Sequence, residues 1–317
     1  MKAVFLDFKS VDAGDLDLTL LRQSHDDWTL HDETVRAETA GRIGQAGIVV
    51  SNKVQIDRTL IENSPELRLI CVAATGTNNV DLEAAKERGI PVTNVTAYGT
   101  PSVVQHVFAL MFALATHLQD YTRLVAEGDW QQSSQFCLLD FPIMELAGKT
   151  LGIIGYGELG RGVAQAAEAF GMRVLIAERR GAEPRPGRVP LDELLAVSDV
   201  VTLHVPLTPE TRNLVDARAL EQMKPSALLI NAARGGVVDE QALADALRAG
   251  RIGGAGVDVL TCEPPADGNP LLAPDIPNLI VTPHIAWASR ESRQRLLDDI
   301  ATTIAEWHAG HLRSRVV

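Results

Sequence analysis

Residues 151–162 read LGIIGYGELGRG, and this stretch decides the fold. Gly155, Gly157 and Gly160 have the spacing G-x-G-x-x-G between an apolar run and a segment, 158–170, with helical periodicity. In a strand–turn–helix unit the first glycine allows a tight turn, the second lets backbone approach a pyrophosphate, and the third lets the helix pack closely on the strand. The helix N-terminus then offers N–H groups and partial positive charge to phosphates. The stretch predicts a doubly wound α/β domain that binds a dinucleotide.

An acidic residue follows the next expected strand, Arg173–Ala177. Glu178 stands 18 residues after Gly160, where a carboxylate can accept both ribose hydroxyls of NAD. Arg179 and Arg180 follow directly, and arginines at this place could hold the 2′-phosphate of NADP. Because Glu178 would repel that phosphate, we expect NAD as the cofactor and leave NADP open.

Short apolar runs alternate with helical patterns along the 317 residues, which predicts an α/β protein of about two domains with mostly parallel sheets. The expected strands are Ala3–Phe8, Ile48–Ser51, Leu69–Val72, a short one at Val92, Thr150–Ile154, Arg173–Ala177, Val200–His204, Leu228–Asn231, Gly256–Val259 and Leu279–Val281. The final helix, Ser289–Gly310, is expected to return to the first domain. The expected domains are therefore 1–100 plus 285–317, discontinuous, and 101–284.

Composition excludes several classes of protein. Lys plus Arg is 29 and Asp plus Glu is 41, so the formal net charge is −12, unlike a protein that binds nucleic acid through its phosphates. Cys71, Cys137 and Cys262 are too few and too scattered for a disulfide framework or a zinc site, so no metal is expected. Neither a signal-peptide core nor a run of about 18 apolar residues is present. We expect a cytoplasmic protein with no nucleic-acid or membrane partner.

Polar residues follow three of the expected strands. Arg234 comes after Leu228–Asn231, Asp258 and Glu263 end or follow the next strand, and His284 follows the last one. Ligands of open α/β sheets bind outside the carboxyl ends of the strands, so these side chains should converge beside the cofactor. Imidazole titrates near pH 6.5 and suits a proton donor, a carboxylate favours imidazolium, and arginine holds a carboxylate and polarises a carbonyl. The set predicts reduction of a carbonyl group in a substrate that also carries a carboxylate.

With these residues the chain resembles the D-isomer-specific 2-hydroxyacid dehydrogenases over nearly its whole length. The matching segments are GYGELG (155–160), NAARGGVVDE (231–240), GVDV followed by CEPP (256–265), TPHIAWAS (282–289), ATGTNNVD (74–81) and SVVQHVFAL (102–110). The resemblance implies two Rossmann-like, doubly wound parallel-sheet domains with a cleft between them. One is a flavodoxin-like substrate domain and the other binds the dinucleotide. It also implies a homodimer with the apolar helix 101–119 at its interface.

The resemblance assigns roles residue by residue, with Asp258 at the nicotinamide end of the cofactor and no metal. The catalytic residues it implies are Arg234, Glu263 and His284. The cofactor contacts it implies are Gly155, Tyr156, Gly157, Glu158, Leu159, Gly160, Glu178, Arg179, Arg180, His204, Pro206, Thr211, Ala232, Ala233, Asp258, His284 and Ala286. The substrate contacts it implies are Lys53, Thr75, Gly76, Thr77, Arg234, His284 and Trp287.

The sequence alone leaves the identity of the 2-oxo acid open. Ser51–Lys53 and the HIAWAS run look most like the glycerate dehydrogenase, or hydroxypyruvate reductase, branch of the family. Another 2-oxo acid is the alternative, such as a phosphoglycerate-derived, branched or aromatic one, since one methylene changes discrimination by only about 1–3 kcal/mol. A further alternative is an NAD-sensing binding protein with little turnover. An extra tail or basic patch, which would favour such a protein, is absent from the sequence.

Overall fold

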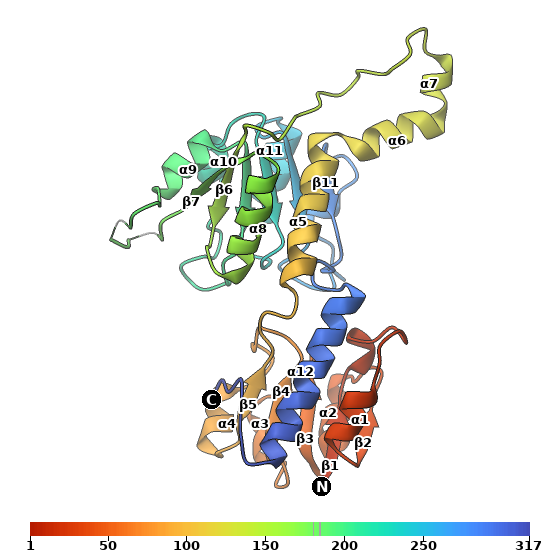
Figure 1. Cartoon of the computed structure of the whole chain (residues 1–317), viewed down its shortest axis with the longest axis vertical. Coiled ribbons are helices and arrows are strands. Elements are labelled where there is room, and N and C mark those ends of the chain that lie inside the picture. Colours follow the sequence, from red (N-terminus) through yellow and green to blue (C-terminus); the bar gives the residue numbers. More distant parts are fainter. Residues whose placement is uncertain (180, 184) are drawn as a thin grey trace. The chain divides into compact units, whose positions relative to one another are not determined.

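The structure is a computed structural model that describes residues 1–179, 181–183 and 185–317. The chain divides into two compact units (Figure 1): unit 1 is Met1–Gly99 with Trp287–Val317, and unit 2 is Thr100–Ala286. These divisions lie one and two residues from the boundaries expected from the sequence. Arg180, an expected cofactor contact, lies outside the described residues.

Unit 1 is built on a five-stranded parallel sheet with strand order β2-β1-β3-β4-β5, the order of flavodoxin-like folds. The strands are β1 Lys2–Phe5, β2 Trp28–Leu30, β3 Ala46–Ser51, β4 Leu69–Val72 and β5 Val92–Asn94. The helices are η1 Phe8–Ser10, α1 Thr19–Ser24, α2 Arg36–Ile43, α3 Arg58–Glu62, α4 Leu82–Glu87 and α12 Arg290–His308.

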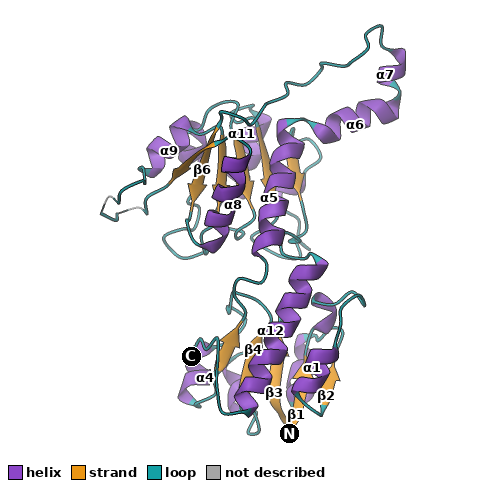
Figure 2. Ribbon diagram, viewed as in Figure 1, coloured by secondary structure: helices purple, strands orange, loops and turns teal. Residues whose placement is uncertain are grey.

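Successive strand residues of unit 1 belong to opposite faces of its sheet. Phe5 and Cys71 pack in the cluster that contains residues of α1 and α12, whereas Val4 and Ile70 pack in the cluster that contains residues of α2, α3 and α4. Side chains of a strand alternate between faces, so both faces of this sheet are buried. Figure 2 shows α12 and α1 over one face. Burial on both sides explains why the strands read as continuous apolar runs.

Unit 2 carries a six-stranded parallel sheet with strand order β11-β10-β9-β8-β6-β7. The strands are β6 Thr150–Ile154, β7 Arg173–Ile176, β8 Val200–Leu203, β9 Leu228–Asn231, β10 Gly254–Val257 and β11 Leu279–Val281. The helices are α5 Thr100–Ala115, α6 Leu118–Glu127, α7 Asp129–Gln132, α8 Glu158–Ala169, α9 Leu191–Val197, α10 Ala217–Gln222, α11 Glu240–Arg248 and η2 Pro270–Leu272. The strand order reverses between β6 and β8, and this is the point where such sheets bind ligands.

Two elements of unit 2 differ from the sequence expectation by two residues or more, whereas β7 and β8 each end one residue earlier than expected. The helix expected over 101–119 ends at Ala115, because His117 takes a left-handed backbone conformation with φ 49°. After this break α6 and α7 extend away from the rest of the unit (Figure 1). The strand expected at Gly256–Val259 lies two residues earlier, since Gly254 pairs with Leu228 of β9.

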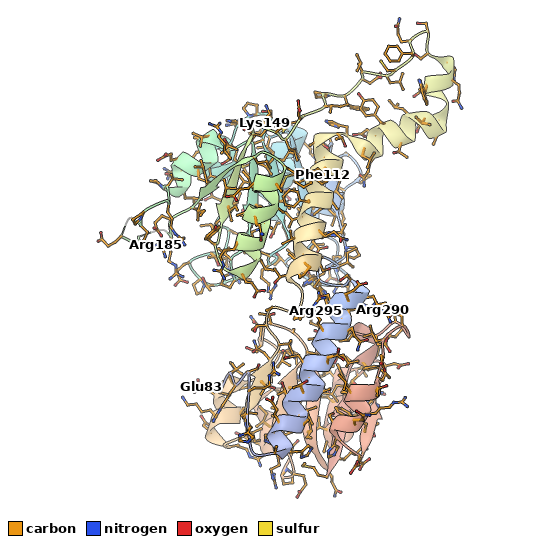
Figure 3. All side chains as sticks on the ribbon, viewed as in Figure 1. Glu83, Phe112, Lys149, Arg185, Arg290 and Arg295 are labelled. Atoms are coloured by element: carbon orange, nitrogen blue, oxygen red, sulfur yellow. The ribbon has the colours of Figure 1, made fainter. Side chains whose placement is uncertain are left out.

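Helix α5 packs on α8 through aromatic rings. The ring of Phe112, labelled in Figure 3, lies 4.9 Å from that of Phe170 with the two planes at 72°. In the described part of the chain no single helix is long and apolar enough to span a membrane. Helices α5 and α6, bent by 56°, pass that test as a pair on length and composition alone.

Candidate active site

The glycine turn after β6 has the geometry of a phosphate cradle. Gly155 has φ 97°, and a Cβ there would lie 2.3 Å from the carbonyl oxygen of His204. A Cβ on Gly160 would lie 2.2 Å from the oxygen of Gly155, so only glycine lets α8 approach the strand this closely. At Gly157, the N-cap of α8, a Cβ would meet no described atom within 4 Å. The turn therefore leaves space at a helix N-terminus, which suits a pyrophosphate.

The residues between and after these glycines belong to the same turn. Tyr156 and Leu159 are partly buried, whereas Glu158 is exposed at the first position of α8. The carboxylate of Glu158 accepts a hydrogen bond from the hydroxyl of Thr100. This contact ties the start of α8 to the start of α5.

The expected ribose ligand, Glu178, carries an ion pair. Its carboxylate accepts from the backbone N–H of Arg179 at 2.8 Å and from Nε of Arg185 at 3.0 and 2.9 Å. The hydrogen bond from Arg185 lowers the pKa of Glu178 to about 2. Glu178 and Arg179 line a pocket of about 310 Å³ together with Arg188. The structure thus places the predicted acid in a pocket and adds a partner, Arg185, that the sequence did not single out.

Residues after β8 form the next part of the site. His204 has its Nε2 3.0 Å from the hydroxyl of Thr202, while its Nδ1 is buried with no hydrogen-bond partner among the described residues. Burial lowers the pKa of His204 to about 4, so this imidazole is neutral at pH 7. The hydroxyl of Thr211 donates to the carbonyl of Pro206 at 2.6 Å and so closes the turn that follows.

The loops after β10 and β11 bring an acid and an imidazole into contact. Nδ1 of His284 lies 2.6 Å from Oε2 of Glu263, and Oε1 of the same carboxylate accepts the N–H of Leu260 at 2.8 Å. His284 has φ 55°, and its N–H donates to the carbonyl of Asp258 at 2.8 Å. Because a carboxylate only accepts, it favours the tautomer with the proton on Nδ1. This pairing is the arrangement that holds an imidazole for proton transfer at Nε2.

Arg234 lies in the loop that follows β9, the strand next to β10 in the sheet. A Cβ on Gly235 would lie 2.0 Å from the carbonyl carbon of Leu260, so the Arg234 loop runs directly against the segment before Glu263. Arg234 is exposed and donates from a terminal nitrogen to the carbonyl of Ala233 at 2.7 Å. Ala233 and the preceding Ala232 are buried at the end of β9. Guanidinium, carboxylate and imidazole are thus carried by adjacent loops at one edge of one sheet.

Asp258 is buried, with 1% of its surface exposed. Its carboxylate is engaged by the N–H of Ile285 at 2.9 Å, the N–H of Ala286 at 2.9 Å, the hydroxyl of Thr282 at 2.5 Å and Nε2 of His106 at 3.4 Å. Burial alone would raise the pKa of Asp258, but these hydrogen bonds lower it below its usual range. In this structure the carboxylate fixes the segment that follows His284, a role beyond the cofactor contact implied by the resemblance.

A family model described as the D-isomer specific 2-hydroxyacid dehydrogenase, NAD binding domain, matches residues 108–286, more than half of the chain. The chain belongs to this family. The match covers the glycine turn, Glu178 and the loops of Arg234, Glu263 and His284, so the NAD-binding function resides in unit 2.

Comparison with individual proteins supports the same family. This 2-hydroxyacid dehydrogenase is 48% identical to the glycerate dehydrogenase of Methylorubrum extorquens, over 98% of this chain and 96% of the relative. It is 41% identical to the hydroxypyruvate reductase of Blautia hydrogenotrophica, over 98% of both. Among solved structures, the TT0316 protein of Thermus thermophilus matches with a TM-score of 0.87 and 34% identity, over 100% of both chains.

Unit 1 of the dehydrogenase carries four of the expected substrate contacts in the loops after β3 and β4, namely Lys53, Thr75, Gly76 and Thr77. The hydroxyl of Thr75 donates to the carbonyl of Val95 at 2.9 Å. This hydrogen bond anchors the start of the loop that contains Gly76 and Thr77. The amide of Asn79 donates to the carbonyl of Val54 at 3.2 Å and so joins this loop to the loop of Lys53.

Asp7 is a residue of unit 1 that the sequence reading missed. It is 7% exposed, and its carboxylate accepts the N–H groups of Asn52 at 2.9 Å, Lys53 at 2.6 Å and Val54 at 3.3 Å. Burial raises the pKa of Asp7, while these backbone hydrogen bonds oppose the rise. The available signal was an acidic residue inside the apolar run VFLDF, at the end of the first strand.

Trp287 packs within unit 1 as well. Its ring lies 6.2 Å from that of Tyr98 with the two planes at 74°, and it contacts the core cluster that contains α12 residues. The indole is thus anchored by packing at the point where the chain returns to unit 1.

Proposed function

We propose that the chain catalyses the NAD(P)-dependent interconversion of a small 2-oxo acid and a D-2-hydroxy acid, with hydroxypyruvate and glyoxylate as its substrates. The observation that carries this proposal is the 2.6 Å contact between His284 and Glu263, at the same edge of the sheet as the glycine turn that follows β6. The similarity to a glycerate dehydrogenase and a hydroxypyruvate reductase supports the choice of substrate.

In the proposed reaction three side chains have separate roles in proton donation, orientation of the imidazole and substrate binding. Bound NADH supplies the hydride that reduces the carbonyl carbon. His284 donates its proton from Nε2 to the carbonyl oxygen, where negative charge develops. Glu263 orients the imidazole through Nδ1 and places a carboxylate beside it. Arg234, always protonated, binds the substrate carboxylate and polarises the carbonyl.

The residues of unit 1 are proposed to recognise the acid itself. Lys53 supplies a positive charge, and the backbone of Thr75–Thr77 supplies N–H groups for the carboxylate. Trp287 is proposed as an apolar wall of the substrate site. The hydroxyl of hydroxypyruvate requires a polar partner, and a site that hydrogen-bonds a hydroxyl discriminates strongly against analogues that lack it.

A panel of 2-oxo acids tests the proposed function. The purified chain is assayed with hydroxypyruvate, glyoxylate, phosphohydroxypyruvate, a branched and an aromatic 2-oxo acid, each with NADH and with NADPH. We expect the highest kcat/KM with hydroxypyruvate or glyoxylate. A higher kcat/KM with a branched or aromatic acid would overturn the substrate assignment. A chain that binds NADH but reduces none of these acids would instead fit an NAD-sensing protein.

We also propose that the chain forms a homodimer, with the arm of unit 2 extending the interface that the resemblance places at the apolar helix 101–119. The arm, residues 116–143, exposes several apolar side chains, among them Trp130, Phe136 and Leu139, of which Phe136 is 89% exposed. Exposed apolar groups gathered on one segment are typical of a protein interface. Analytical ultracentrifugation should give twice the 34.2 kDa mass of the chain. A monomer at micromolar concentration would contradict this proposal.

A further inference from the structure

The ion pair of Glu178 and Arg185 occupies the place where the cofactor ribose would be recognised. Glu178 follows β7, and Arg185 lies in the loop that returns to the sheet at the bridge between Ala177 and Val189. Figure 3 labels Arg185 in this loop, beyond the end of β7. The guanidinium and the backbone N–H of Arg185 both donate to the carboxylate, the latter at 3.1 Å.

This pairing commits most of the accepting capacity of Glu178. A carboxylate has about four lone-pair sites. Here Arg185 donates from Nε, from a terminal nitrogen and from its backbone, and Arg179 adds its own N–H. For Glu178 to accept two ribose hydroxyls, the guanidinium of Arg185 must leave. The ribose hydroxyls of NAD therefore compete with the guanidinium of Arg185 for the carboxylate of Glu178.

The same pairing changes the charge that a 2′-phosphate would meet. Glu178 is ionised at neutral pH, because its pKa is about 2. An unpaired carboxylate there would repel a phosphate, but the cation of Arg185 offsets it. Arg179 and Arg188 line the same pocket, and Asp192 is its other acid. The described lining of the pocket thus carries two cations and two acids, and Arg185, paired with Glu178, adds a third cation.

We propose that Arg185 is a cofactor-specificity residue, which pairs with Glu178 so that the site accepts NADPH as well as NADH. With NADH, the ribose hydroxyls displace the guanidinium from Glu178. With NADPH, the guanidinium stays at the pocket, and its planar donors suit a phosphate. The inference rests on the proposed use of NAD(P) by this chain and concerns its adenosine ribose end.

The test is the ratio of dissociation constants for the two cofactors, measured by calorimetric titration without substrate. In Arg185→Ala the carboxylate is unpaired, so the Kd for NADPH should rise about tenfold, equivalent to about 1.4 kcal/mol, while the Kd for NADH stays equal or falls. Arg185→Lys keeps the charge and should show a smaller change. Glu178→Gln removes the acid and should shift the ratio toward NADPH.

Arg248→Ala is the matched control, because Arg248 is also paired through two nitrogens with an acid, Asp275, in the same unit. It should leave the cofactor ratio unchanged. If Arg185→Ala folds as the wild type does, by circular dichroism, and changes the ratio no more than Arg248→Ala, the inference is overturned. If Arg185→Ala does not fold, Arg185→Lys and Glu178→Gln decide it, and an unchanged ratio in both overturns it.

The proposed function fails separately from this inference. A wild-type chain that binds both cofactors but reduces no 2-oxo acid contradicts the proposed reaction alone. A change in the cofactor ratio of Arg185→Ala supports the inference even then. A wild-type chain that binds neither cofactor overturns both.

Discussion

Glu263 fixes the imidazole of His284 and is itself fixed by the backbone. Its Oε2 lies 2.6 Å from Nδ1, while Oε1 accepts the N–H of Leu260 at 2.8 Å. A carboxylate held at one oxygen can orient the ring that it contacts with the other. The imidazole is thus presented in one orientation and one tautomer, with Nε2 as the nitrogen for proton transfer.

Replacing this carboxylate should damage turnover more than binding. Glu263→Gln keeps the shape but replaces the carboxylate that contacts Nδ1 by a neutral amide, so we expect kcat to fall about 10²-fold or more. The Kd for NADH should be unchanged, since Glu263 is not among the expected cofactor contacts. Steady-state kinetics with hydroxypyruvate and an NADH titration measure the two quantities.

Glu240→Gln is the control for Glu263→Gln. Glu240 accepts the N–H of Thr261 at 2.6 Å and so supports the same loop without a described contact to the imidazole. It should lower stability and leave kcat close to the wild-type value. Equal losses of kcat in the two variants would show that the loop, and not the carboxylate charge, is what matters.

Replacement by alanine should weaken cofactor binding at one glycine of the turn and lower the stability of the fold at another. At Gly157 an added methyl group meets no described atom, so Gly157→Ala should fold normally and raise the Kd for NADH about tenfold or more, by blocking the approach of backbone to phosphate. At Gly160 the methyl group meets the backbone oxygen of Gly155 at 2.2 Å, so Gly160→Ala should lose about 1–3 kcal/mol of stability.

Denaturant unfolding and NADH titration separate these two effects. Wild-type cofactor affinity in Gly157→Ala would show that the space beside this residue does not receive the pyrophosphate. A wild-type unfolding free energy in Gly160→Ala would show that the close approach of α8 to the turn can relax.

Stability should fall as the pH drops below neutrality, with a contribution from His204. Its pKa is about 4 in the folded chain, because it is buried, and about 6.5 when unfolded. Between these values the unfolded chain binds more protons, so acidification removes up to about 3 kcal/mol of stability through this residue. Urea unfolding at several pH values should give a flatter profile for His204→Asn than for the wild type. If the unfolding free energies of the two chains change with pH in parallel, groups other than His204 cause the pH dependence.

Asp7 should affect the substrate and not the cofactor. Asp7→Asn replaces one accepting oxygen by a donor that faces backbone N–H groups, which disturbs the loop of Lys53. We expect KM for the 2-oxo acid to rise while the Kd for NADH stays constant. If Asp7 acts by placing Lys53, the double variant with Lys53→Ala should be little worse than Lys53→Ala alone. Fully additive losses would assign Asp7 a purely structural role.

The sequence predicted the bounds of a strand closely where polar residues or turns flank its apolar run. It did not do so where the run contains several glycines or where the apolar pattern continues beyond the end of the element. The strands at Leu69–Val72, Thr150–Ile154 and Leu228–Asn231 have the bounds expected from sequence. Strand β10 begins in a run of glycines, where no side-chain pattern marks the start and pairing with β9 sets the register. The end of α5 was missed because the apolar pattern continues past the left-handed His117.

Within the candidate site, residues directly after strands could be predicted because parallel strands end at one edge of a sheet. The partners of those residues could not. Asp7 meets the loop of Lys53 across a sequence separation of 46 residues, and Arg185 reaches Glu178 only through the conformation of its loop. Such contacts depend on tertiary structure, which the local sequence pattern does not carry.

The central claim is that His284 protonates the carbonyl oxygen of a 2-oxo acid. The most direct test compares NADH oxidation with hydroxypyruvate in the wild type and in His284→Gln, alongside NADH titration of both. We predict a turnover about 10²- to 10⁴-fold slower in His284→Gln, with a Kd for NADH close to that of the wild type. A His284→Gln chain that oxidises NADH at the wild-type rate would contradict the claim.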